Sequence, residues 1–327
     1  MSFFLISIFC LFVLEVIYFK IADRFNIIDK PNLRSSHTQI TLRGGGIIFP
    51  LALIIGVMVI EPSQYFLAIG VFAIATISFL DDIMTLNNKL RIGLHLVSVL
   101  LILTQVFFNQ NISFSFNLAS CLLIIVSLII IIGIINAYNF MDGINGITVL
   151  YSYVTIATCF YLQKFLNIHL LQDPIFYLLI ASLLVFGFFN LRKKAKTFAG
   201  DVGSITMALI ISFFLLTLIA ATNNLKWVLL LGIYGLDAVA TIICRIIRKE
   251  NIFDAHRSHF YQYLANDRKW PHVLIAVLYA SLQMLLNVTL INLESPVLII
   301  GIFMVFIMAY ATLRLSLEGK KRLFFKY

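Results

Sequence analysis

The chain has 327 residues, of which 61% are hydrophobic and only 12% are charged. Its mean hydropathy of +1.00 excludes an ordinary soluble globular protein. Several apolar runs exceed the roughly 18 residues that mark a membrane-spanning helix. The sequence therefore predicts an all-α polytopic membrane protein, with residues 1–327 forming a single membrane-embedded domain. The net charge of +9 does not indicate nucleic-acid binding, because no soluble basic region is present to hold a duplex.

Eleven apolar segments are predicted to be membrane spans. They cover residues 2–22, 45–60, 64–80, 93–108, 117–135, 147–163, 174–190, 205–222, 226–244, 272–291 and 296–313. With eleven crossings, 22 of the 24 Lys and Arg residues fall in segments on one side of the membrane, and only Lys164 and Lys226 fall on the other. An excess of positive charge marks the cytoplasmic side. We therefore expect the N-terminus outside and the C-terminus in the cytoplasm.

The first predicted cytoplasmic loop is polar and leads into a glycine-rich sequence. It contains Arg34 and His37, and Arg43-Gly-Gly-Gly46 opens the second span. Glycines at a helix start let the backbone approach a ligand and leave N–H groups free for an anion. A flexible turn between two helices would explain the glycines equally well. Arg34 and Arg43 are candidate phosphate ligands beside them.

Two adjacent carboxylates, Asp81 and Asp82, end the third span. At a helix C-terminus they oppose the helix dipole and repel each other. They therefore need a cation nearby, either a metal ion or Lys89 and Arg91. A solvated cap at the membrane surface is the alternative explanation.

The densest polar stretch reads Asn136-Ala-Tyr-Asn-Phe-Met-Asp-Gly-Ile-Asn-Gly146. Asn136, Asn139, Asp142 and Asn145 recur every three residues, so they would share one face if the preceding helix continued through them. A carboxylate and three amides are costly to desolvate without partners. We therefore predict that this stretch binds something polar.

A basic run, Arg192-Lys-Lys-Ala-Lys196, precedes the Gly200-Asp-Val-Gly-Ser204 sequence and the eighth span. Asp201 and Ser204 lie at the predicted helix N-terminus, where a carboxylate is favoured and a hydroxyl can cap. Capping does not explain why a carboxylate between glycines follows four cations so closely. The arrangement suits a divalent metal ion that bridges a carboxylate and phosphates, with Lys196 and its neighbours balancing the remaining charge.

Two further features lie towards the C-terminus. Asp237 is inside the ninth span, where an acid is either functional or half of a helix-to-helix pair. The last cytoplasmic loop contains His256-Arg-Ser-His259, and neither histidine is expected to contribute to core packing because both lie outside the predicted spans. A zinc site there would need further ligands. Phosphate contacts by His256, Arg257 and His259 fit this loop better.

Taken together, these motifs resemble those of the polyprenyl-phosphate N-acetylhexosamine-1-phosphate transferases. That superfamily includes the lipid I-forming enzyme of peptidoglycan synthesis and the enzymes that start O-antigen and related glycans. Five motifs in family order carry the resemblance over nearly the whole chain. They are the Arg34-Ser-Ser-His37 loop with Arg-Gly-Gly-Gly, the Asp-Asp pair, Asn-x-x-Asn-Phe-Met-Asp-Gly, Gly-Asp-Val-Gly-Ser and His-Arg-Ser-His. Eleven spans resemble the glycan-initiating branch, whereas the peptidoglycan enzyme has ten.

The resemblance implies an Mg²⁺-dependent phosphotransferase of the bacterial inner (cytoplasmic) membrane, with Mn²⁺ as an alternative ion. Such an enzyme transfers a HexNAc-1-phosphate from a UDP-N-acetylhexosamine to undecaprenyl phosphate at the cytoplasmic face and releases UMP. The product would start a lipid-linked glycan such as O-antigen, capsule or a cell-wall polymer. A homodimer is compatible with this assignment. The motifs do not name the sugar, and UDP-GlcNAc, UDP-GalNAc and UDP-linked deoxy-amino sugars all remain open.

The resemblance also assigns roles to the acidic residues. Asp201 corresponds to the metal-binding aspartate of the family, and Asp142 to a residue on the metal or catalytic side. Asp81 and Asp82 correspond to the essential acidic pair. One of these two would act as a base, unless both only organise charge and metal.

Substrate contacts are implied at the remaining motifs. The predicted substrate ligands are Asn139, Asn145, Lys196, His256, Arg257, His259, Arg34 and Arg43. Asn139 matches a nucleotide-side residue, and the histidine loop matches the segment that holds the diphosphate or the sugar. The chain departs from many relatives at Asn145, where they carry a second aspartate. It also replaces the three consecutive histidines of the peptidoglycan enzyme, which argues against a muramoyl-pentapeptide substrate.

A multi-span lipid or sugar transporter, such as a flippase, is the alternative class. A transporter would place polar residues near the bilayer midplane on broken helices, whereas these motifs lie at one interface. A phosphotransferase of the CDP-alcohol type needs an Asp-Gly-x-x-Ala-Arg signature, which the sequence after Asp142 lacks.

Overall fold

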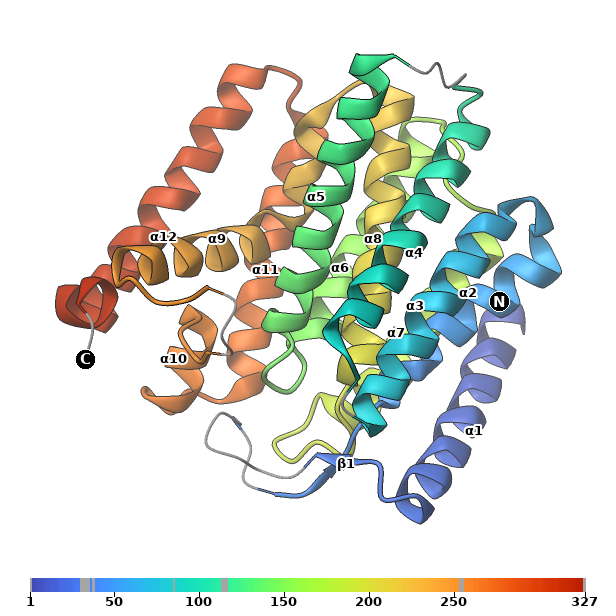
Figure 1. Cartoon of the computed structure of the whole chain (residues 1–327), viewed down its shortest axis with the longest axis horizontal. Helices are drawn as coiled ribbons and strands as arrows, with labels where there is room; N and C mark the ends of the chain where they lie inside the picture. The colour runs from blue at the N-terminus through green and yellow to red at the C-terminus, as the bar shows by residue number, and fades with distance from the viewer. Residues whose placement is uncertain are drawn as a thin grey trace.

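The computed structural model describes residues 2–29, 36, 39–84, 86–112, 117–252 and 256–325. Its α-helices are α1 (Ser2–Arg24), α2 (Ile48–Ile60), α3 (Tyr65–Ile83), α4 (Asn88–Asn109), α5 (Leu118–Met141), α6 (Ile147–Phe165), α7 (Asp173–Asn190), α8 (Gly200–Thr222), α9 (Gly232–Ile247), α10 (Phe260–Asn266), α11 (His272–Asn292) and α12 (Pro296–Phe324). Short 3₁₀ segments are η1 (Gly45–Ile47), η2 (Pro62–Gln64) and η3 (Leu225–Leu231). Strands β1 (Ile28–Asp29) and β2 (Thr41–Leu42) pair antiparallel. Figure 1 shows a helical bundle, and the predicted all-α class is confirmed.

Nine helical segments within the described residues are long and apolar enough to cross a membrane. The two remaining predicted spans also form helices, but they differ from the nine. α2 with η1 is shorter, covering Gly45–Ile60, and α6 is rich in hydroxyl side chains. Both pack much of their surface against other helices, so neither needs an apolar face all round. The chain is thus a multi-pass membrane protein, and nine candidate spans lie within its described residues. The count of eleven crossings and the sidedness of the termini stay predictions.

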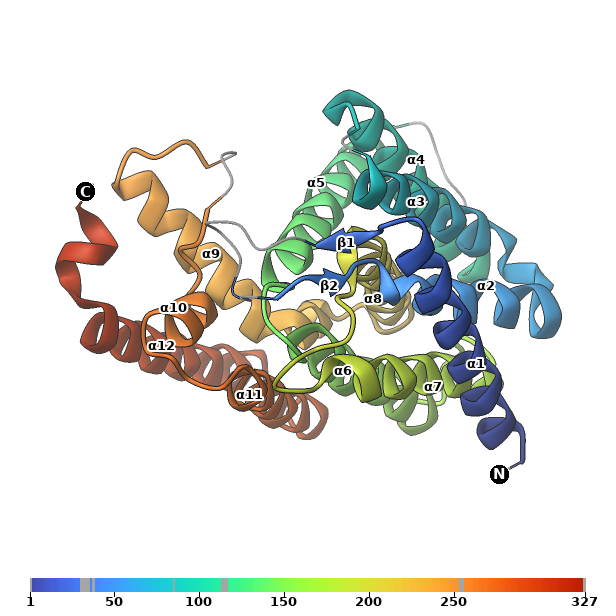
Figure 2. The ribbon, with the colours of Figure 1, turned by 90° about the horizontal axis from the view of Figure 1, so that it is seen from below.

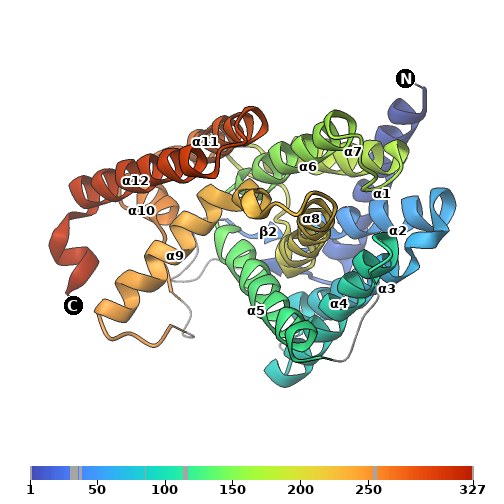
Figure 3. The same ribbon diagram turned by 90° about the horizontal axis from the view of Figure 1, so that it is seen from above.

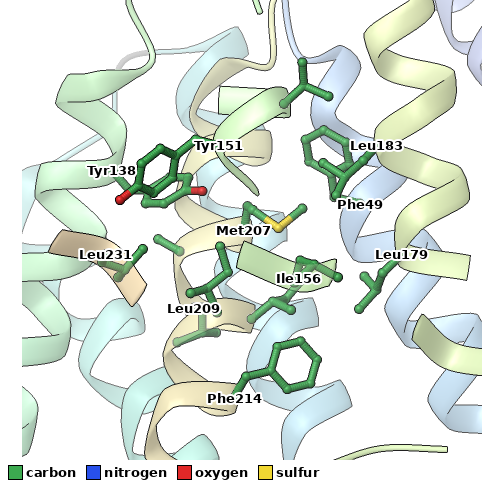
Figure 4. Close-up of a cluster of buried hydrophobic side chains, with 14 of the residues drawn as sticks. Phe49, Tyr138, Tyr151, Ile156, Leu179, Leu183, Met207, Leu209, Phe214 and Leu231 are labelled. Atoms are coloured by element: carbon green, nitrogen blue, oxygen red, sulfur yellow. The ribbon is translucent and has the colours of Figure 1, made fainter. Parts of the chain in front are cut away.

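α8 is the central helix of the bundle. Of its most apolar 18-residue window, 89% is buried, and Figure 3 shows it surrounded by α2, α3, α4, α5 and α6. Met207, Leu209 and Phe214 of α8 lie among Phe49 and Ile156 of neighbouring helices in Figure 4. Because lipid tails are as apolar as this core, close side-chain packing stabilises the arrangement more than removal from water does.

The ninth predicted span, residues 226–244, is broken. η3 is followed by α9, which lies across the bundle in Figure 1 instead of continuing along it. The side chain of Gln283 in α11 pairs with backbone groups at the break. Its Oε1 accepts from Ile233 N at 3.0 Å and its Nε2 donates to Leu229 O at 2.9 Å. Tyr151 OH donates to the same Oε1 at 2.5 Å. Irregular backbone is tolerated at membrane depth only where protein groups satisfy it in this way.

The glycines of Arg43-Gly-Gly-Gly46 allow close backbone packing. The N–H groups of Gly45 and Gly46 donate to two carbonyls that immediately precede α8, at 2.9 and 3.1 Å. A Cβ at Gly46 would lie 2.4 Å from Cα of Gly203, because the two backbones touch. The prediction that these N–H groups are free for an anion is therefore wrong for Gly45 and Gly46. Their partners are backbone carbonyls of the same chain.

We expect Gly46→Ala to destabilise the protein. The added methyl group would meet the Gly203 backbone, which cannot swing aside as a flexible side chain does. Overpacking of this kind costs about 1–3 kcal/mol, so the Tm in detergent should fall by about 2 °C or more. Gly133→Ala is the matched control, because a Cβ at Gly133 meets nothing within 4 Å. Equal Tm values for the two variants would contradict the packing role.

Candidate active site

Polar segments from distant parts of the sequence meet at one end of the bundle. They are the C-terminal ends of α3 and α5, the N-terminal end of α8, and Arg43, which follows β2. Figure 2 shows β1 and β2 over this end of α8, where Leu42 of β2 bridges to Thr197. The structure therefore brings together motifs that lie up to 158 residues apart in the sequence.

Asp82 joins three of these segments. Its carboxylate is fully buried and accepts from the backbone N–H of Asp201 at 2.9 Å and of Val202 at 3.0 Å. Nε of Arg43 lies 2.7 Å from Oδ1 of Asp82. A carboxylate at a helix N-terminus satisfies free N–H groups and is favoured by the helix dipole. Asp82 therefore fixes the start of α8 and the position of Arg43 together.

Asp201 lies between two guanidinium groups. Its Oδ1 is 3.4 Å from Nη2 of Arg43, and its Oδ2 is 3.8 Å from Nη2 of Arg91. Arg91 also forms an ion pair with Asp81, with 2.8 Å between Nη1 and Oδ2. Burial opposes the charge of Arg43, but Asp82 and Asp201 outweigh it and raise the pKa of Arg43 above its ordinary value. The cation that the acidic pair needs is thus provided by Arg91 for Asp81 and by Arg43 for Asp82.

Asp142 lies beside this cluster, immediately after α5. Thr148 Oγ1 donates to its Oδ1 at 2.5 Å. Burial raises the pKa of Asp142 to about 7, and the charges of Asp201 and Asp82 act in the same direction. Without a bound cation, its protonated and ionised forms are therefore both populated near neutral pH. The influence of Asp201, Asp82 and Arg43 on the pKa of Asp142 is the observation that connects it with this cluster.

The predicted polar row of the central stretch is only partly helical. α5 ends at Met141, so Asn136 and Asn139 are on the helix and Asn145 is in the turn that follows. Asn136 is exposed, whereas Oδ1 of Asn139 accepts from Ser204 Oγ of α8 at 2.8 Å. Asn145 is buried and its Nδ2 donates to the Arg192 carbonyl at 2.8 Å. The single face that the period of three predicts is therefore not formed. A nucleotide contact of Asn139 or Asn145 stays a prediction.

The predicted cationic ligands lie in different environments. The exposed Lys196 side chain has its ammonium 5.6 Å from the centroid of the Phe19 ring. Arg34 lies outside the described residues. Arg43 contacts the acidic cluster directly, through Asp82 and Asp201.

The histidine loop precedes α10 and packs against the Asp142 segment. His259 is only 2% exposed, and its Nδ1 lies 3.2 Å from Oδ1 of Asp237. The prediction that neither histidine contributes to core packing is therefore wrong for His259. His256 is half-buried, and burial together with His259 lowers its pKa to about 3, so it is uncharged at neutral pH. The Phe140 ring, two residues before Asp142, lies 5.5 Å from the His256 ring and 6.3 Å from that of His259.

Sequence reasoning missed two partners in this region. Nη2 of Arg314, near the end of α12, donates to the Ser258 carbonyl at 2.6 Å, and Nη1 donates to Thr241 Oγ1 at 3.0 Å. The Arg314 side chain is buried, so it is structurally committed to this loop. The second partner that sequence reasoning missed is Asp237, which pairs with His259. The available signals were an arginine directly after the last predicted span and an aspartate within the ninth, since charges at or within the membrane need partners.

The acidic cluster suits a hard divalent cation. Four carboxylates lie within electrostatic reach of two guanidinium groups, and these residues are Asp81, Asp82, Asp142, Asp201, Arg43 and Arg91. Mg²⁺ prefers oxygen ligands and usually takes one or two carboxylates together with substrate phosphates. Among the described residues, no group of three or more His, Cys, Asp or Glu side chains that could hold a metal ion is found. Asp201 and Asp142 are the ligands that fit best, because Asp82 is occupied by the α8 backbone.

A multi-pass helical bundle with buried carboxylates and arginines at one end defines a membrane enzyme of phosphate chemistry rather than a transporter with a midplane site. Residues 64–219 match the model of glycosyl transferase family 4. The chain belongs to this family, and it is therefore an enzyme of the glycosyl-1-phosphate transferase type.

Three relatives illustrate the similarity. A probable undecaprenyl-phosphate N-acetylglucosaminyl 1-phosphate transferase of Bacillus subtilis (strain 168) is 25% identical over 319 residues, covering 93% of this chain and 88% of the relative. A phospho-N-acetylmuramoyl-pentapeptide-transferase of Lactobacillus helveticus is 30% identical over 226 residues, covering 62% and 68%. The undecaprenyl-phosphate alpha-N-acetylglucosaminyl 1-phosphate transferase of Escherichia coli (strain K12) is 28% identical over 277 residues, covering 79% and 74%.

Proposed function

We propose that the protein transfers a HexNAc-1-phosphate from a UDP-sugar to undecaprenyl phosphate at the cytoplasmic face of a bacterial inner membrane. The observation that carries the proposal is the meeting of Asp81, Asp82 and Asp201 with Arg43 and Arg91 at one end of the bundle. Such a site suits two phosphorylated reactants that would otherwise repel each other. The names of the relatives from B. subtilis and E. coli support undecaprenyl phosphate as the acceptor. The positive charge of the predicted cytoplasmic segments supports the sidedness.

The reaction exchanges one diphosphate bond for another. An oxygen of the lipid phosphate attacks the β-phosphorus of the UDP-sugar, the bond between the β-phosphorus and the bridging oxygen breaks, and UMP leaves with that oxygen. The sugar keeps its bond to the transferred phosphate. Since bonds of the same type form and break, the enzyme has mainly to align the reactants and neutralise their charge.

Individual residues have distinct parts in this scheme. Asp201 and Asp142 would hold Mg²⁺, or Mn²⁺ in its place, and the bound ion would supply charge neutralisation at the phosphates. Asp82 holds the start of α8, and Arg43 and Arg91 hold the Asp201 side chain in place. A general base is hardly needed, because the second pKa of a phosphate monoester is about 6. At pH 7 the lipid phosphate has therefore mostly lost its last proton. We therefore weight alignment and charge above proton transfer by Asp81 or Asp82.

A turnover assay with a panel of sugars tests the proposal. Purified protein should be incubated with undecaprenyl phosphate, Mg²⁺ and UDP-GlcNAc, UDP-GalNAc or a UDP-linked deoxy-amino sugar. We expect UMP and a lipid diphosphate sugar, detected by mass spectrometry, with one sugar strongly preferred. Release of UDP instead of UMP would mean transfer of the sugar alone and would contradict the proposal. Folded protein that leaves every UDP-sugar intact would also contradict it.

A further inference from the structure

A buried carboxylate and a buried imidazole meet between α9 and the histidine loop. Asp237 has no exposed surface, and its Oδ1 is 3.2 Å from Nδ1 of His259. The same carboxylate accepts from the backbone N–H of Phe260 at 3.1 Å and of Tyr261 at 3.3 Å. Tyr279 OH of α11 donates to its Oδ2 at 2.5 Å. Asp237 therefore holds the start of α10 and the His259 ring together.

These contacts determine which ring nitrogen of His259 carries the proton. An ionised carboxylate only accepts hydrogen bonds, so the nitrogen that faces Asp237 must be the donor. That nitrogen is Nδ1, and the hydrogen bond orients the ring as well. Carboxylate partners of this kind commonly set the tautomer of a working histidine, so that its other nitrogen faces the ligand.

The other nitrogen, Nε2, is buried and has no hydrogen-bond partner among the residues that the structure describes. A buried polar atom without a partner is destabilising, so a ligand that pairs with Nε2 would be stabilised. The His259 ring lies beside the chain segment that leads to the acidic end of the bundle. The ring of Phe140 lies 6.3 Å from that of His259, and the Phe140 carbonyl accepts from Tyr261 OH at 2.7 Å. Asp142 follows Phe140 by two residues.

We propose that Asp237 is the positioning residue of His259, and that it directs Nε2 of the imidazole to a diphosphate oxygen of the UDP-sugar. The inference rests on the proposed function. In the complex, Nδ1 would donate to the Asp237 carboxylate and Nε2 to a phosphate oxygen, so the ring would lie between two anions. Arg314 supports this geometry from α12 through the Ser258 carbonyl, next to His259. No covalent step passes through either residue.

Two substitutions of His259 separate its two nitrogens. In His259→Asn the side-chain amide stands near the position of Nδ1, so the contact with Asp237 is retained and the contact of Nε2 with substrate is lost. We expect the Tm in detergent to stay close to that of the wild type while kcat/KM falls 10-fold or more. In His259→Gln the amide reaches the position of Nε2, so more activity and less stability should remain than in His259→Asn. Full activity of His259→Asn would overturn the proposal.

A double-substitution cycle tests the part of Asp237. If Asp237 acts through His259, Asp237→Asn should lower kcat/KM about 10-fold in the wild type and hardly at all in the His259→Asn background. Tyr279→Phe is the matched control, because it removes a hydrogen bond from the same carboxylate without touching Nδ1 of His259. Its effect should be the same in both backgrounds. Equal losses from Asp237→Asn in both backgrounds would show a structural role only.

The outcomes also separate this inference from the proposed function. If the wild-type protein releases no UMP from any UDP-sugar, the proposed function fails. If the wild type turns over and His259→Asn is as active as the wild type, the assignment of Asp237 and His259 fails alone. If Asp237→Asn does not fold, the activities and Tm values of His259→Asn and His259→Gln still test the proposal, because both variants leave Asp237 in place.

Discussion

Asp201→Asn should abolish transfer and leave the protein folded. The amide keeps the size of the side chain, but it removes the negative charge with which Asp201 would hold Mg²⁺ beside Arg43 and Arg91. The Asp201 side chain is 16% exposed and does not hold the α8 backbone, unlike that of Asp82, so little stability should be lost. We expect kcat to fall about 1,000-fold or more, equivalent to roughly 4 kcal/mol of transition-state stabilisation. UMP release and the Tm in detergent are the measurements.

Asp173→Asn is the matched control for this prediction. Asp173 pairs with Lys164 at 2.6 Å on the far end of the bundle, where both side chains are partly exposed. Surface pairs contribute about 0–1 kcal/mol, so this variant should keep wild-type activity. A chelator should inactivate the wild type, and added Mg²⁺ or Mn²⁺ should restore it. Near-normal turnover by Asp201→Asn would contradict a metal-binding role of Asp201 and leave Asp142 and Asp81 as the candidate ligands.

The sequence predicted the helices well, because membrane spans are long apolar runs and their pattern is local. It did not predict the break between η3 and α9. Residues 226–244 are mostly apolar apart from Lys226 and Asp237, and the group that stabilises the break, Gln283, lies 50 residues after Ile233. α6 is the opposite case, because its sequence is less apolar than that of the other spans and it still forms a long helix. Buried contacts with its neighbours allow a helix that is less apolar than the other spans.

The residues of the candidate site could be predicted from the sequence, but the contacts between them could not. The sequence pointed to Asp81, Asp82, Asp142 and Asp201, but nothing local indicates that Asp82 caps α8, 119 residues away. The glycine triplet illustrates the same limit. Glycines allow either a ligand or another backbone to approach, and only the contact with Gly203 decides between the two. His259 was misjudged for the same reason, since the residue that draws it into the core lies in another helix.

Asp82→Asn should lower both stability and activity. One of its two carboxylate oxygens would become an N–H₂ group facing a backbone N–H at the start of α8, and the buried charge opposite Arg43 would be lost. Breaking a buried ion pair by changing one partner costs about 3–5 kcal/mol. The Tm should therefore fall by about 5 °C or more. Activity should fall further than the loss of folded protein explains, because Asp201 follows directly on this cap.

Asp81→Asn tests whether the neighbouring acid has a part beyond structure. Asp81 is 10% exposed, and its Oδ1 accepts from Leu86 N at 2.9 Å, a bond that an amide oxygen can keep. Only the pair with Arg91 is weakened, so the Tm should change by less than about 2 °C. A 10-fold or larger loss of kcat/KM at unchanged Tm would identify Asp81 as a member of the reacting site. If Asp81→Asn keeps full activity and Asp82→Asn loses it only in proportion to unfolding, the two acids organise the helix ends and Arg43, and the reaction depends on Asp201 and Asp142 instead.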